Sequence, residues 1–296
     1  MIFVELNFMK PTIIVWKEPN RAQTPPLHIA SRGERYSTLT GAWWIDEYRI
    51  AVNHRSGLRI AIFDIRDASK PIVIAEIPHL SDDIAAKFIT ENYWEISVSG
   101  CWEEAYSVYK LVMKSEPEMS LQYTKHHKDR TFSHGVAYGK NGELCVAFHT
   151  GNNPRIEISD KAWKLPEPWG ARDVCYDYEN DKYYAIAVSH NPQKSSYQNT
   201  STSVWTYEAD IDDWKIASKI SGVHSDACQV YRGRLWIPDQ KGDRVFGLDL
   251  SQKSHPITLS GKCFNFPHGL AISDFGMLAV TNYGNSSITL MDISNL

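Results

Sequence analysis

The sequence predicts an all-β fold, a six-bladed β-propeller, from its composition, its strand pattern and an internal repeat. Aromatic residues make up 12% of the 296 residues, and short β-branched and aromatic runs alternate with Gly, Asn, Asp and Pro, which is typical of strands joined by tight turns. Similar segments recur along the chain, and such self-similarity indicates a repeat architecture. The clear copies span residues 39 to 65, 132 to 158, 224 to 250 and 266 to 293. Weaker copies span residues 81 to 112 and 171 to 193.

Each copy has the same order of elements, which predicts one blade per copy. A small residue opens a first strand, a turn with Gly or Asn leads to a second strand that ends in a polar residue, and a third strand follows. The first strands begin near Gly41, Asp83, Gly135, Asp173, Ala227 and Gly269. A spacing of about 40 to 55 residues suits a blade of four antiparallel strands. Fourth-strand candidates lie at residues 71 to 77, 213 to 220 and 255 to 261. Two stacked β-sandwiches are the alternative, and the even spread of the copies disfavours them.

The sixth copy ends at Leu296 after only three strands. Its fourth strand is therefore expected from the N-terminal segment, from residues 12 to 17 or from residues 27 to 31. Residues 1 to 36 then act as a closing strand and lead-in, and residues 1 to 296 form a single domain. Radial closure of this kind leaves only short and protected sheet edges.

Charge and hydropathy exclude several classes of partner. The chain has 31 Lys and Arg against 35 Asp and Glu, a net charge of -4, so no basic field is available to hold nucleic acid. No apolar run approaches the 18 or so residues of a membrane-spanning helix, and the first residues do not read as a secretion signal. We expect a cytoplasmic protein with no nucleic-acid or membrane partner. Its five scattered cysteines form no evident disulfide or zinc framework.

Two of the copies resemble a known group of propellers. The segments PHGLAISDFGMLAVTNYGNSSITLMDI (267 to 293) and SDACQVYRGRLWIPDQKGDRVFGLDL (225 to 250) are similar to blades of the NHL, SMP-30/gluconolactonase and lactonase-like group. The resemblance implies a six-bladed propeller. That group includes lactone hydrolases, lyases, a Pictet-Spengler condensing enzyme and pure binding scaffolds, so the resemblance does not imply one reaction.

Hairpin geometry predicts two rings of side chains at one mouth of the channel. In an antiparallel hairpin the start of the inner strand lies beside the end of the second strand. The residues just before the small opening residues are Thr40, Asp82, His134, Arg172, Asp226 and His268. The first polar residues after the second strands are His54, Gly100, His149, His190, Asp239 and Asn282. Five of the 11 histidines of the chain fall in these rings, which is far more than chance placement gives.

Imidazoles and carboxylates that converge in this way suit a divalent metal ion, which we expect to be Zn, Mn, Fe or Ca. The candidate ligands are His134, His149, His190 and His268, with Asp239, Asp226 and His54 as alternates or orienting groups. A purely structural role stays open, because polar residues at strand starts often bond backbone groups that a β-ladder leaves unpaired.

The remaining ring residues suggest roles toward a substrate. Arg172 can hold a carboxylate or phosphate in bidentate fashion, and Asp226 and Asp82 are candidates for a general base, with His54 beside them. Residues 191 to 203 form a long polar stretch, which is typical either of a lid or binding loop, with Tyr197 directed inward, or of a disordered surface loop. The expected substrate-binding residues are Arg172, Thr40, Asn282, Tyr197 and Trp102.

These features predict an enzyme that acts on a small polar or anionic substrate as a metal-assisted, lactonase-like hydrolase or lyase. The gluconolactonase pattern resembles a Glu/Asn/Asp calcium site, whereas histidine dominates here. This difference shifts the expectation from sugar-lactone hydrolysis toward lyase, isomerase or metal-free His/Asp acid-base chemistry. No GxGxxG, P-loop, HExxH or GxSxG motif occurs in a credible context. The alternative is a non-catalytic propeller that presents the same mouth to a carbohydrate or a protein partner.

Overall fold

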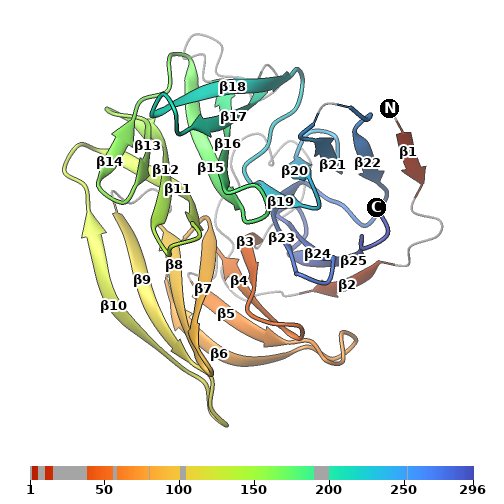
Figure 1. Cartoon of the computed structure of the whole chain (residues 1–296). Coiled ribbons are helices and arrows are strands. Elements are labelled where there is room, and N and C mark those ends of the chain that lie inside the picture. The colour runs from red at the N-terminus through yellow and green to blue at the C-terminus, as the bar shows by residue number, and fades with distance from the viewer. Residues whose placement is uncertain are drawn as a thin grey trace.

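Six β-sheets stand like petals around a common axis in the computed structural model (Figure 1). The structure describes residues 2–5, 11–15, 39–55, 59–79, 81–100, 105–189, 200–251 and 253–296. All of the regular elements in these ranges are strands. The described residues include no helix that is long and apolar enough to cross a bilayer. The prediction of a six-bladed β-propeller is confirmed.

The first three blades are formed by consecutive strands. Blade one contains β3 (Leu39–Trp44), β4 (Arg49–His54), β5 (Arg59–Asp64) and β6 (Ile72–Pro78). Blade two contains β7 (Ile84–Thr90), β8 (Tyr93–Ser99), β9 (Ala105–Val112) and β10 (Glu118–His126). Blade three contains β11 (Thr131–Tyr138), β12 (Leu144–Gly151), β13 (Arg155–Ile158) and β14 (Lys161–Trp163). The first strand of each blade lies nearest the axis (Figure 1).

The last three blades include both strands of the N-terminal segment. Blade four contains β15 (Trp169–Asp177), β16 (Lys182–Ser189), β17 (Thr202–Glu208) and β18 (Asp213–Ile220). Blade five contains β19 (Gln229–Tyr231), β20 (Arg234–Asp239), β21 (Arg244–Asp249), β22 (Ile257–Ser260) and β1 (Ile2–Glu5). Blade six contains β23 (Pro267–Ile272), β24 (Met277–Asn282), β25 (Ser287–Asp292) and β2 (Thr12–Val15).

The N-terminal segment closes the ring as the sequence predicts. Strand β2 pairs antiparallel with β25, with Ile14 opposite Ile288. The closing strand is therefore the run that begins at Thr12, and the other candidate, residues 27 to 31, lies outside the described residues. Strand β1 adds an element that the sequence did not indicate, because it pairs in parallel with β22 at the outer edge of blade five.

The hydrophobic core lies between the blades rather than in one central mass. Among the described residues, six buried clusters form, and each joins two neighbouring blades. In one of them Leu39 and Val52 of blade one meet Ala279 and Leu290 of blade six, which closes the circle. Both faces of the middle strands are therefore covered, and this explains why β4, β5, β8 and β9 are buried along most of their length.

The predicted blade starts are close to the strand boundaries, with the largest differences in blades three and four. There β11 begins at Thr131 rather than near Gly135, and β15 begins at Trp169 rather than near Asp173. In both blades the inner strand starts before the predicted opening residue. That residue follows a register irregularity inside the strand and does not mark the strand end. Four of the cysteines are free and buried, as expected for small hydrophobic side chains.

Candidate functional site

Irregularities in the inner strands place the side chains of the first predicted ring. The pairing of inner and second strands changes register around Thr40, His134, Arg172 and His268. A β-bulge leaves one residue without a partner across the ladder and redirects its side chain. Four of the six ring residues thus sit at a bulge, and the side chains of three of them, His134, Arg172 and His268, lie close to Asp226.

Glycine lets neighbouring blades approach at the same level. A Cβ at Gly41 would lie 2.7 Å from the Cα of Asp83 in blade two. A Cβ at Gly135 or Gly269 would likewise overlap atoms of the following blade. The recurrent His-Gly pair therefore has two functions: the glycine permits close contact between blades, and the preceding histidine faces the channel.

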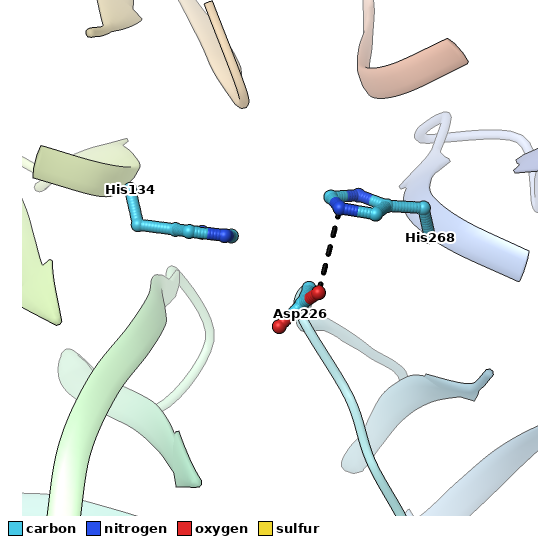
Figure 2. A group of neighbouring side chains, drawn as sticks. All are labelled: His134, Asp226 and His268. Atoms are coloured by element: carbon cyan, nitrogen blue, oxygen red, sulfur yellow. Dashed lines mark ion pairs between the residues drawn. The ribbon is translucent and has the colours of Figure 1, made fainter. Parts of the chain in front are cut away.

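Three side chains from three blades converge at this mouth (Figure 2). His134 comes from β11, His268 comes from β23, and Asp226 lies just before β19. One ligand atom from each residue lies within 4.8 Å of those of the other two, and all three residues are buried. Figure 2 shows both imidazoles directed toward the carboxylate, and His268 Nε2 lies 3.4 Å from Asp226 Oδ2.

The Asp226 carboxylate is the centre of this group. It accepts a 2.7 Å hydrogen bond from Gln240 Nε2, and its other oxygen lies 3.4 Å from His224 Nε2 and 3.5 Å from Arg172 Nε. Burial alone would raise the pKa of Asp226, but the charge of Arg172 and the contacts with His224 and His268 hold it well below its usual value. Asp226 is therefore a fixed negative charge at neutral pH.

The surrounding histidines are neutral imidazoles. Burial lowers the pKa of His134 and His224, lowers that of His149 well below its usual value, and lowers that of His268 to about 4. The rings also contact one another: His134 lies edge-on to His149 at 4.9 Å and stacks with His268 at 6.1 Å between ring centroids. Neutral imidazole is the form that binds metal ions.

Three further predicted residues lie in the same layer without joining the three-residue group. Asp82 is buried and faces Arg55, with 3.5 Å between Asp82 Oδ1 and Arg55 Nη1. The hydroxyl of Thr40 donates to the carbonyl of Ser81, which links blade one to blade two. His54 is fully buried at the end of β4, opposite Leu39.

Two predicted residues have structural partners instead. Asp239 accepts hydrogen bonds from the backbone amide of Lys241 and from Arg244 Nε, so its carboxylate holds the turn that follows β20. The side chain of Asn282 donates to the Cys263 carbonyl and to Thr289 Oγ1, and accepts from the Asn265 amide. Neither belongs to the group formed by His134, Asp226 and His268. His190, Tyr197 and Trp102 lie outside the described residues.

Sequence reasoning missed two contacts of the site, His224 and Gln240. Both are buried and touch Asp226. His224 also shares a 2.9 Å hydrogen bond with Thr200 Oγ1, which fixes its ring. The signals were present, since His224 stands two residues before Asp226 and Gln240 directly follows Asp239, but the alignment selected only one residue per strand end.

A second layer, in which Asp173 is buried and Asp83 is half-buried, lies one residue deeper in the channel. Asp83 accepts a hydrogen bond from the Val136 amide of blade three, and Asp173 accepts one from the Cys228 amide of blade five. The Asp173 and Asp83 carboxyls also lie close enough for each to affect the pKa of the other. Burial raises the pKa of Asp83 to about 7 and raises that of Asp173 well above its usual value. This carboxyl pair joins blades and lies beneath the His/Asp group.

Comparison with known proteins identifies the architecture. The sequence matches no family model and no curated protein. Among solved structures, a protein of unknown function from Bacteroides thetaiotaomicron is similar with a TM-score of 0.66 and 13% identity, over 96% of this chain and 76% of that one. A glucose dehydrogenase is similar with a TM-score of 0.62 and 11% identity, over 86% of this chain and 96% of that one. Streptogramin B lyase is similar with a TM-score of 0.58 and 8% identity, over 95% of this chain and 97% of that one. At these identities the similarity is one of fold, a propeller shared by enzymes and by a protein of unknown function.

Proposed function

We propose that the mouth formed by His134, Asp226 and His268 is the active site of an enzyme that binds a divalent metal ion and a small anionic substrate, with hydrolase or lyase chemistry. The observation that carries the proposal is the convergence of two imidazoles and a carboxylate from three blades within 4.8 Å. The glucose dehydrogenase and the lyase with similar folds are both named as enzymes, which is consistent with a catalytic role.

The donor set fits a first-row transition metal better than calcium. Two neutral imidazoles and one carboxylate suit Zn²⁺, Mn²⁺ or Fe²⁺, whereas Ca²⁺ takes six to eight oxygen ligands. His134 Nδ1 is buried and has no hydrogen-bond partner among the described residues, which is unusual for a buried ring nitrogen. A metal held by three protein ligands would leave a position for water or substrate and would polarise a carbonyl or acidify that water.

The neighbouring side chains would orient the ligands and the substrate. Gln240 and His224 hold the Asp226 carboxylate in place, as outer partners of metal ligands do. The Arg172 side chain is 19% exposed and that of Arg55 is 18% exposed, against 8% for Asp226. These two guanidinium groups therefore stand at the accessible side of the group, where they would attract a carboxylate or phosphate. Since Asp226 and His149 are both weak bases, Asp82 is the remaining carboxylate of the predicted ring that would accept a proton.

Metal analysis of protein purified without a histidine tag tests the site. We expect about one transition metal ion per chain, lost in His134→Ala and His268→Ala and retained in His255→Ala, which changes an exposed histidine of a surface turn. Folded, metal-free protein whose metal uptake is the same in all three variants would refute the proposed centre.

The reaction class needs a separate measurement. Thermal-shift screening with small carboxylates, phosphate esters and lactones would identify a ligand, and turnover of related compounds would follow. Hydrolysis incorporates solvent oxygen into the product, whereas elimination creates a double bond that absorbs in the ultraviolet. A chain that responds to none of these compounds but binds a carbohydrate or a protein partner would instead be the non-catalytic propeller.

A further inference from the structure

The opposite mouth of the channel contains a separate cavity of about 780 Å³. Its walls come from the far ends of the inner strands and from the turns that follow them, in all six blades. His134 and His268 lie near the starts of the inner strands β11 and β23, whereas the cavity residues Tyr138 and Ile272 lie at the ends of the same strands. Asp83 and Asp173 lie between the two regions. This cavity is therefore distinct from the proposed active site.

Aromatic rings dominate the walls. Nine of the 20 lining residues are aromatic, against 12% in the whole chain. Phe88 of blade two, Tyr178 of blade four and Phe275 of blade six are 62%, 58% and 67% exposed. Rings of this size are normally covered in a folded chain, and a cluster of exposed ones marks a binding surface. These three residues alternate around the mouth, and Trp43, Tyr138 and Tyr231 line the cavity with them.

The charged residues that line the cavity are all acidic. They are Asp46, Glu47 and Asp274, and none of the lining residues that the structure describes is Lys, Arg or His. Asp46 is bound to Arg49. Glu47 and Asp274 are exposed and form no ion pair within the described ranges. Two carboxylates thus line a mouth of aromatic rings, and no Lys or Arg in the described part of the chain forms an ion pair with either of them.

Two cations of the chain already lie over aromatic rings that line the cavity. Lys87 Nζ lies 4.8 Å from the centroid of the Tyr138 ring and pairs with Glu95. The Arg232 guanidinium lies 5.2 Å from the centroid of Tyr231 and donates to the Ser294 carbonyl. Both cations are engaged there, and the rings are oriented so that positive charge contacts their faces. The face of an aromatic ring attracts a cation through its quadrupole.

We infer that this mouth binds a small organic cation, a quaternary ammonium or protonated amine carried on an apolar body. The volume lies in the range of small-molecule sites, which are mostly apolar with a few placed polar groups. Ring faces recognise the ammonium group, Glu47 and Asp274 supply the opposite charge, and the apolar body fills the space between the inner strands. An anion would meet like charge, and a neutral compound would gain only the apolar contact.

The test uses benzyltrimethylammonium, with benzyl alcohol and phenylmethanesulfonate as neutral and anionic compounds that share the benzyl group. Binding is followed by calorimetry and by the fluorescence of the tryptophans in the wall. We expect the cation to bind at least tenfold more tightly than either control compound. Phe275→Ala and the double variant Glu47→Gln, Asp274→Asn should each weaken it by about two- to fivefold or more.

Matched controls keep the outcome clear. Tyr123→Ala changes an exposed ring on the outer strand β10, and Glu116→Gln changes an exposed acid in the turn before it. Both should leave binding unchanged, as should His134→Ala at the other mouth. The changed residues of the cavity rim are exposed, so the variants should fold. Equal affinity for the three compounds, or binding of the cation that ignores Phe275 and the two acids, would overturn the inference.

Discussion

Gly269 lies so close to the carbonyl oxygen of Thr40 that a Cβ at position 269 would overlap that oxygen. The backbone amide of Gly269 donates to Thr281 Oγ1. The Thr281 hydroxyl in turn donates to the Thr40 carbonyl. Blade six therefore meets blade one through a glycine, a threonine hydroxyl and a backbone carbonyl. This junction also sets the position of His268, which precedes the glycine.

Gly269→Ala should destabilise the fold by about 1 to 3 kcal/mol, because the added methyl must displace backbone atoms at the junction. Gly222→Ala is the comparison: nothing lies within 4 Å of its Cβ position, but its φ of +75° is unfavourable for alanine. It should cost about 1 kcal/mol, from backbone strain alone. Urea unfolding of both variants measures the difference, and a larger loss at Gly222 would contradict the crowding argument.

The carboxyl pair of the half-buried Asp83 and the buried Asp173 predicts a dependence of stability on pH. Asp83 has a pKa of about 7 in the folded chain, against 3.8 ordinarily. A raised pKa means that the folded state favours the protonated carboxyl, so this contribution is present below pH 4 and is lost as the pH rises through 7. For a shift of this size the loss is on the order of 2 to 4 kcal/mol.

Asp83→Asn should remove most of this loss. The amide can accept from the Val136 amide as the carboxylate does, and it stays neutral at every pH. The variant should match the wild type near pH 4 and exceed it in unfolding free energy at pH 8, while Glu116→Gln should show the wild-type slope. Chemical unfolding at several pH values measures this. If the unfolding free energy of Asp83→Asn and of the wild type depended on pH in the same way, Asp83 would be ionised over the whole pH range measured.

The fold could be predicted because each blade repeats one order of strands and turns. The repeat shows which segments are equivalent. The last copy has only three strands, and this predicts that the ring is closed by a strand from elsewhere in the chain. Strand β1 could not be predicted in the same way, because Ile2–Glu5 is a four-residue run outside the repeat. Its parallel partner, β22, lies far along the chain, and the choice of such a partner depends on the assembled ring.

The site could be predicted in part for the same reason. Alignment on the strand starts selected His134, Arg172, Asp226 and His268, and the structure brings these four together. The alignment had no means to show that Asp239 turns toward Arg244 while its neighbour Gln240 reaches Asp226. Side-chain direction at the end of a strand depends on the turn that follows, and turns differ among the blades.

Gln240→Ala tests the orienting role of that neighbour. Removal of a 2.7 Å hydrogen bond to a buried carboxylate should lower the unfolding free energy by about 1.5 to 3 kcal/mol. If Asp226 is a metal ligand, metal affinity should also fall by about 10- to 100-fold. Gln122→Ala on the exposed strand β10 is the control. Loss of stability with unchanged metal affinity would separate the structural role of Gln240 from the proposed metal site.

Closure by β2 predicts unequal losses of stability when two adjacent isoleucines are changed to alanine. Ile14 is 3% exposed and packs in the cluster between blades six and one, whereas Ile13 is 48% exposed on the other face of the strand. Ile14→Ala should lower the unfolding free energy by about 2 to 4 kcal/mol through lost burial and the cavity left behind. Ile13→Ala should change it by less than about 0.5 kcal/mol. Urea unfolding of the two variants measures both effects, and because the strand, the residue type and the substitution are the same, only the inward or outward direction of the side chain differs. Equal and small losses would mean that residues 12 to 15 are not part of the stable ring.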